Sequence, residues 1–138
     1  MILLLDTHAW IWSVAGERIG RRAQRAIARA DTHDAIRVSP VSVFELTALH
    51  TAGRLRLSTV PAEWIRQSFS TSSIRLAAYS TEVAIDAGSI PRTALADPLD
   101  RLIVATARQL DATLLTADGR ILEYARATGN VRAQDAGV

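Results

Sequence analysis

The chain has 138 residues, 49% of them hydrophobic, so it is long enough for one domain (residues 1–138) with a real core and too apolar to be disordered. It has no cysteine, no basic leader and no apolar run of membrane-spanning length. These absences exclude disulfides and thiolate metal sites, and we expect a soluble cytoplasmic protein that does not bind membranes. All sixteen basic residues are arginine, which excludes a P-loop and suits a surface that binds RNA.

Short apolar runs alternate with helical patterns along the chain, without repeats or low-complexity linkers. Gly16 and Gly53 are expected helix stops, and Ser39-Pro40 is typical of a helix start. This alternation predicts an α/β fold with a mainly parallel sheet between helices. The expected strands are Ile2–Leu5, Ile36–Val38, Ile74–Ala77, Thr113–Leu115 and Val131–Ala133. The expected helices are Thr7–Val14, Arg21–Ala30, residues 40–52, Pro61–Phe69, Thr81–Ile90, Asp97–Leu110 and Gly119–Thr128.

Two aspartates directly follow expected strands. Asp6 ends the first strand, and Asp118 comes soon after Thr116 at the end of the fourth. In parallel sheets, sites gather outside the carboxyl ends of the strands, where both would lie. Each also has a plainer interpretation: Asp6 as a helix N-cap, and Asp118 with Gly119 as a turn or cap.

Glu45 falls within the apolar face of the third expected helix, among Val41, Ala48, Leu49 and Ala52. Burial of an unpaired carboxylate costs several kcal/mol, so Glu45 requires either a buried partner, such as Arg101, or a role in a site. The sequence favours the site.

The segment from Asp97 to Arg101 needs two interpretations. Asp97 before Pro98 is typical of an N-cap. Asp100 lies on the inward stripe of its helix, near the positive N-terminal end, because Ile103, Val104 and Ala107 follow at helical spacing. Asp100 is therefore a candidate site residue.

Four segments together resemble the motifs of PIN-domain ribonucleases, and within them the VapC toxins of bacterial toxin–antitoxin pairs. They are LLLDTHAWIW with Asp6, SPVSVFELTALHTAGRLRL with Glu45, DPLDRLIVATARQL with Asp100 and its neighbour Asp97, and ATLLTADGRILEY with Asp118. One departure is the stretch from Thr93 to Ala96, where many relatives carry a histidine. The resemblance covers nearly the whole chain.

The resemblance implies a PIN-like three-layer sandwich and an endoribonuclease that depends on Mg²⁺ or Mn²⁺. It also implies RNA as substrate and a VapB-type antitoxin as partner. The implied metal ligands are Asp6, Glu45, Asp100 and Asp118. These oxygen ligands would hold one or two ions that activate a water for attack on a phosphodiester.

Several residues have open roles. Thr7 and Thr116 either orient ligands or act as ordinary caps, and Arg101 either holds RNA or pairs with an acid. His8 could reach a phosphate, although a local hydrogen bond within its helix is the commoner role. The tryptophans are expected in the core or at an apolar surface for a homodimer or antitoxin.

Alternative explanations remain at the level of sequence. Codon usage that favours arginine would explain the absence of lysine. A phosphatase or phosphoacceptor domain also has an aspartate after its first strand, but it usually needs a lysine. A non-catalytic partner-binding module could keep the fold without the chemistry.

Overall fold

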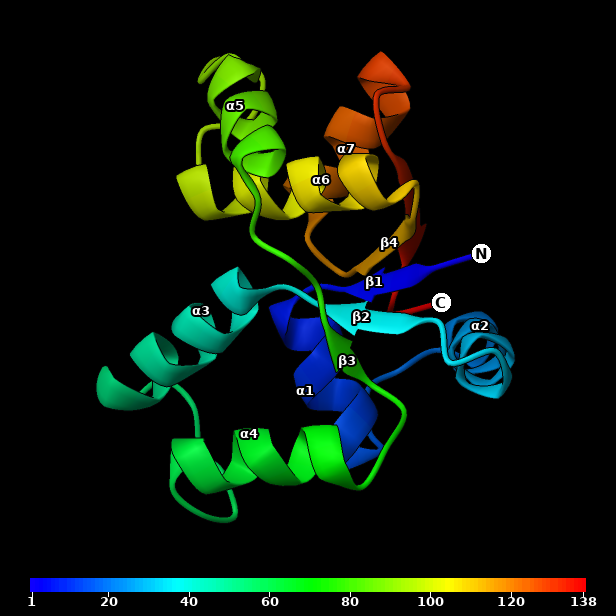
Figure 1. Ribbon diagram of the computed structural model, residues 1–138, viewed down its shortest axis with the longest axis vertical. Coiled ribbons are helices and arrows are strands. Elements are labelled where there is room, and N and C mark those ends of the chain that lie inside the picture. The colour runs from blue at the N-terminus through cyan, green and yellow to red at the C-terminus, as the bar shows by residue number, and fades with distance from the viewer.

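A computed structural model describes residues 1–138. Its elements form a five-stranded sheet between two groups of helices (Figure 1). The strands are β1 (Leu3–Leu5), β2 (Ile36–Val38), β3 (Arg75–Leu76), β4 (Thr113–Thr116) and β5 (Arg132–Asp135). The helices are α1 (Thr7–Ala15), α2 (Arg21–Thr32), α3 (Pro40–Thr51), α4 (Pro61–Ser70), α5 (Thr81–Ser89), α6 (Pro98–Leu110) and α7 (Gly119–Thr128).

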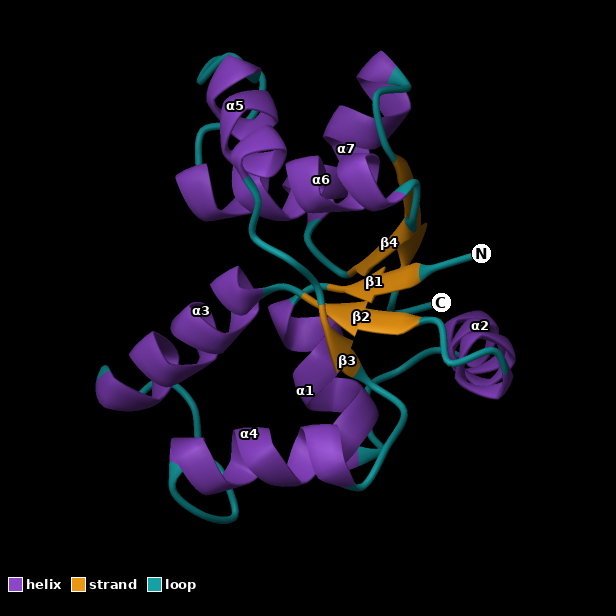
Figure 2. Ribbon diagram, viewed as in Figure 1, coloured by secondary structure: helices purple, strands orange, loops and turns teal.

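All strand pairs are parallel, in the order β3-β2-β1-β4-β5. Figure 2 shows the strands as a layer with α5, α6 and α7 on one side and α1, α3 and α4 on the other. Helices on both faces let a parallel sheet bury both of its surfaces. The predicted α/β three-layer sandwich is thus confirmed.

The central strand β1 supplies side chains to two separate cores. Leu3 and Leu5 pack with α1 and α2, whereas Leu4 packs with α6 and α7. This alternation follows from the pleat of a strand, in which successive side chains point to opposite faces. A run of three leucines is therefore suited to a strand covered on both sides.

Local signals set most of the element bounds. The Ser39 hydroxyl accepts a hydrogen bond from the Val41 N–H at the start of α3, and Gly16 ends α1 in the left-handed conformation.

The last strand is shifted relative to its prediction. It extends to Asp135 because β5 pairs with all of β4, from Thr113 to Thr116. This pairing joins distant parts of the chain, so the local composition does not predict it.

Trp10 is the largest fully buried side chain and joins α1 to α4. Its ring meets Trp64 edge-on at 5.2 Å and stacks on Phe69 at 5.7 Å, and its indole N–H donates to the Ser68 hydroxyl at 2.6 Å. The predicted core role thus holds for Trp10 and Trp64. None of the helices is both long and apolar enough to span a bilayer.

We predict that Trp10→Ala lowers the free energy of unfolding by about 3–5 kcal/mol, because it empties a buried site and leaves Ser68 without its donor. Urea unfolding followed by circular dichroism measures this change. Ile85→Ala is the control, since Ile85 is 65% exposed and should cost less than about 0.5 kcal/mol. Equal losses in the two variants would contradict the packing described for Trp10.

Candidate active site

A cavity of about 290 Å³ opens at the carboxyl ends of β1 and β4. In Figure 1 these strand ends lie on the side of the sheet where α3 begins. All four acids predicted to meet line this cavity, and so does the acidic neighbour in the third motif. The acidic lining consists of Asp6, Glu45, Asp97, Asp100 and Asp118, and the remaining lining residues are Thr7, His8, Trp12, Ile103 and Ala117.

Asp6 both caps a helix and faces the cavity. Its Oδ1 accepts a hydrogen bond from the Ala9 N–H at 2.9 Å, which caps α1. Its Oδ2 accepts a hydrogen bond from the Thr116 hydroxyl at 2.5 Å. Burial raises the pKa of the Asp6 carboxyl, although these two donors oppose the shift.

Asp118 and Asp97 combine the same two roles. The Asp118 Oδ1 accepts from the Arg120 N–H at 2.8 Å and caps α7, and the Asp97 Oδ1 accepts from the Leu99 N–H at 2.9 Å and caps α6. A cap uses only one carboxylate oxygen in each residue. The predicted cap of Asp97 is thus confirmed, and Asp118, for which the sequence left a cap and a site as alternatives, is a cap that also lines the cavity.

Glu45 lies at the cavity for a reason that differs from the predicted one. The buried face of α3 consists of Val41, Ser42 and Leu46, whereas Ala48 and Ala52 are exposed. The expected apolar stripe through Ala48 and Ala52 is therefore wrong. Glu45 is half-buried at the border of the true buried face, where the Thr7 hydroxyl donates a hydrogen bond to its Oε1.

Asp100 carries the clearest electrostatic signature. It is 6% exposed, and its Oδ2 is buried without a hydrogen-bond partner. Burial raises its pKa to about 7, and the neighbouring charges of Asp97, Asp118, Glu45 and Asp6 act in the same direction. A buried carboxylate oxygen without a donor is rare in folded proteins and calls for an explanation.

Arg101 does not neutralise these acids. It forms none of the four salt bridges and does not line the cavity, and its Nε is buried without a partner. The alternative that Glu45 has a buried ion-pair partner in Arg101 is therefore wrong. The groups that face the acids of the cavity are instead helix N-termini, hydroxyl groups and His8.

Two further side chains line the cavity, although the sequence gave little indication of this. His8 is exposed at the cavity, and its positive form lowers the pKa of Asp6. Trp12 is half-buried beside it, with the two rings 6.1 Å apart and tilted by 58°. The spacing of four residues on α1 is the signal that could have paired them.

The donor set fits a hard divalent cation held partly through water. The oxygens that line the cavity belong to carboxylate and hydroxyl groups, the types that Mg²⁺ and Mn²⁺ prefer, and they include the unpartnered Oδ2 of Asp100. No three acidic or histidine side chains surround a single point at direct ligand distance. Because Mg²⁺ usually keeps several waters, a looser ring of carboxylates still suits it.

Comparison with known proteins identifies the family. The PIN domain family matches residues 3–127. The chain is 34% identical over 123 residues to Ribonuclease VapC22 of Mycobacterium tuberculosis, a match covering 88% of this chain and 91% of the relative.

Solved structures share the fold at lower identity. VapBC2 from Rickettsia felis, bound to a promoter DNA fragment, contains a chain with a TM-score of 0.70 and 17% identity, covering 98% of both chains. VapBC-1 from nontypeable Haemophilus influenzae gives a TM-score of 0.68 at 18% identity over 100% of both chains. DNA-bound VapBC from Salmonella typhimurium gives 0.67 at 22% identity over 98% of both.

We predict that the metal-free protein loses stability as pH rises from about 4 to about 7. The folded state of Asp100 holds its proton up to about pH 7, whereas the unfolded state releases it near the ordinary value of 3.8. The folded state therefore binds more protons across this window, and its advantage disappears as pH increases. Urea unfolding in EDTA at about pH 5 and about pH 8 measures the difference.

Asp100→Asn is the matched comparison, because the amide stays neutral at both pH values. Its stability should change less between the two pH values than that of the wild type. An identical pH dependence in both proteins would show that Asp100 does not titrate in this window.

Proposed function

Since this chain belongs to the PIN-domain family, in its VapC branch, we propose that it is an endoribonuclease that depends on Mg²⁺ or Mn²⁺ and acts as the toxin of a toxin–antitoxin pair. The observation that carries this proposal is the gathering of five carboxylates from four motifs in one cavity, where none of the five forms a salt bridge. Such crowding is costly unless a cation is present.

Asp6, Glu45, Asp100 and Asp118 would hold the cation, with Asp97 at the edge. When bound, the cation would supply positive charge next to the scissile phosphate and would make a water more acidic. Asp100 must release its proton before it can act as a ligand, so cation affinity should rise as pH increases toward neutral.

Two threonines position the carboxylates. The Thr116 hydroxyl donates to Asp6 and accepts from the Asp118 N–H at 3.0 Å, so it links the ends of β1 and β4. The Thr7 hydroxyl donates to Glu45 and links α1 to α3. Both hydroxyls limit the rotation of the carboxylates that they contact.

Several exposed apolar side chains are candidates for contacts with a partner protein. Phe44 is 63% exposed and directly precedes Glu45 on α3, so a VapB-type antitoxin that covers its ring would lie next to the acidic cavity. Val60 and Tyr79 are also more than half exposed, and these are candidates for a homodimer contact. Trp10 and Trp64 are buried and cannot serve this purpose.

We expect Asp6→Asn to reduce RNA cleavage by at least about a hundredfold, because the amide keeps the helix cap but loses the negative charge that binds the cation. Cleavage of total RNA in Mn²⁺, with mapping of the new ends, measures the activity. Calorimetry should show weaker Mn²⁺ binding by the same variant. Glu17→Gln removes an exposed charge outside the cavity and serves as the control. Full activity of Asp6→Asn would reject the proposed function.

Thr116→Val should lower cleavage about tenfold to a hundredfold by freeing the Asp6 carboxylate, with a smaller effect on the Michaelis constant for RNA. Thr106→Val is the matched control. Thr106 is equally buried, but its hydroxyl donates only to the Leu102 carbonyl within α6. If the two variants lost the same activity, Thr116 would have no positioning role beyond packing.

A further inference from the structure

Helix α2 carries a concentration of cationic side chains, none of which lines the acidic cavity. Four arginines of this helix are exposed, and none takes part in a salt bridge. We call them the α2 arginine face: Arg21, Arg22, Arg25 and Arg29. Elsewhere in the chain, Arg75, Arg108, Arg126 and Arg132 pair with acids.

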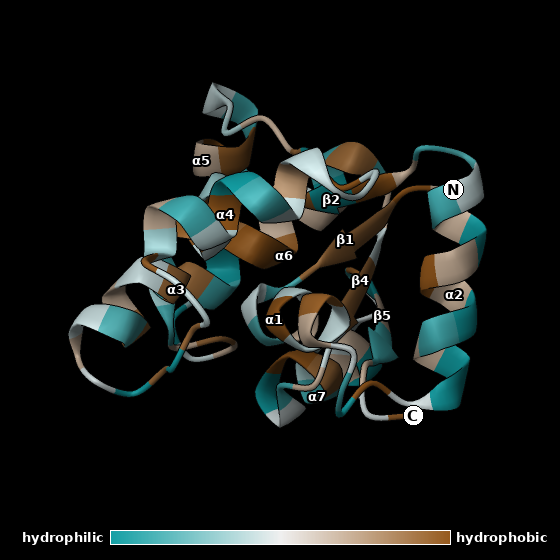
Figure 3. Cartoon of the chain, turned by 90° about the horizontal axis from the view of Figure 1, so that it is seen from below, coloured by the Kyte–Doolittle hydropathy of each residue, from teal (hydrophilic) through white to brown (hydrophobic).

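The charges on α2 are segregated by sign. With about 3.6 residues per turn, the four arginines fall within an arc of roughly 100°. The single acid of the helix, Asp31, lies about 180° away from Arg22 and accepts a hydrogen bond from Ser73 instead. Figure 3 shows α2 as mainly hydrophilic along its length, beside the apolar β1. The arginine face is therefore not neutralised by its own helix.

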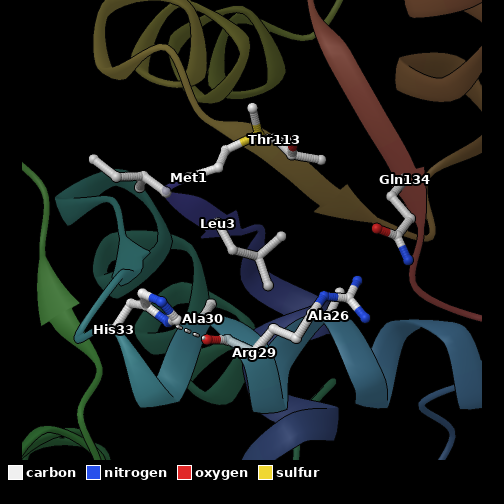
Figure 4. A pocket seen from close by; sticks show the side chains of 9 residues that line it. Met1, Leu3, Ala26, Arg29, Ala30, His33, Thr113 and Gln134 are labelled. Carbon is white, nitrogen blue, oxygen red and sulfur yellow. Dashed lines mark hydrogen bonds between the residues drawn. The ribbon is translucent and has the colours of Figure 1, made fainter.

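A second cavity, of about 340 Å³, lies at the C-terminal half of this face. Its base is apolar and includes Leu3, Ala26 and Ala30, which are buried. Figure 4 shows Arg29 and His33 on one side of Leu3 and Thr113 on the other. Gln134 of β5 extends toward Arg29 in the same view. The size and the mixture of apolar and polar groups suit one planar ligand.

Several polar atoms of this cavity are available to a ligand. The Arg29 guanidinium forms no salt bridge. The Nδ1 of His33 is engaged by the Arg29 carbonyl at 3.1 Å and the Thr32 hydroxyl at 2.9 Å, so its Nε2 is the nitrogen left to face a ligand. The Gln134 side chain offers both a donor and an acceptor.

The two cavities lie at opposite ends of the sheet. The second cavity includes Leu3 at the amino end of β1, whereas Asp6 follows its carboxyl end. Three residues of extended strand separate them by about 10 Å along the sheet. A ligand that reached both would have to be a polymer rather than a single nucleotide.

We propose that the α2 arginine face and this cavity form a second RNA-binding site, which holds the phosphates of the substrate on the arginines and one unpaired base in the cavity. This inference rests on the proposed ribonuclease function. Arg22 and Arg29 are about 10 Å apart along the helix, far enough to contact more than one phosphate of a strand. An acidic peptide would also satisfy the arginines, but the apolar base of the cavity and the amide of Gln134 match a nucleobase better.

The test uses the full chain in EDTA, where binding is measured without cleavage, and a structured RNA with a single-stranded loop. The triple variant Arg22→Gln, Arg25→Gln, Arg29→Gln should weaken binding at least about tenfold. It should also reduce the slope of log affinity against log salt by about 2, since each lost contact removes about 0.7. The matched control, Arg56→Gln, Arg66→Gln, Arg92→Gln, removes equal charge from exposed, unpaired arginines elsewhere.

Gln134→Leu tests the cavity separately. It should weaken binding of the looped RNA about fivefold or more and leave a fully paired duplex unaffected, because only an unpaired base can enter. Equal loss in both arginine triples, or no loss in the α2 triple, would overturn the proposal. So would a defect confined to antitoxin binding, which would identify an acidic protein segment as the occupant.

Cleavage of a short oligonucleotide in Mn²⁺ separates this proposal from the proposed function. An oligonucleotide too short to leave the acidic cavity should be cut equally by the wild type and the α2 triple variant. Failure of the wild type to cut any RNA would reject the ribonuclease function itself. Normal cutting of short and long RNA by the α2 triple would reject only the second site.

Discussion

Repulsion among carboxylates at one edge of the sheet is the constraint around which this structure is organised. Five acids share a cavity that contains no arginine. Three of them face the N-termini of α1, α6 and α7, whose N–H groups each occupy one carboxylate oxygen. The Thr116 hydroxyl occupies the second oxygen of Asp6, and the Thr7 hydroxyl occupies one oxygen of Glu45. Asp100 has neither on its Oδ2, and its burial, together with the charges of the neighbouring acids, raises its pKa to about 7.

The fold could be predicted because its signals are local. Short two-sided apolar runs, Gly16 after α1 and Ser39-Pro40 before α3 define elements without knowledge of the rest of the chain. The length of the last strand could not be predicted in this way. It depends on pairing with β4, which comes earlier in the chain and is separated from it by α7.

The candidate site was predicted less evenly than the fold. The positions of Asp6 and Asp118 follow from strand ends, which periodicity reveals. The position of Glu45 was predicted from the wrong helical face, because a stripe of small apolar residues such as Ala48 also occurs on exposed surfaces. The contribution of His8 and Trp12 could not be weighed from sequence, since it depends on which face of α1 borders the acids.

The three-residue length of β1 has a consequence for how such a chain can change. Leu3 and Leu5 belong to one core and Leu4 to the other, and Asp6 follows directly. Inserting or deleting one residue in this stretch would exchange the leucines between the two layers and turn the aspartate to the opposite face. Natural variation should therefore replace residues here but not alter their number, whereas the loops that begin at Gly16 and Gly53 can change length at lower cost.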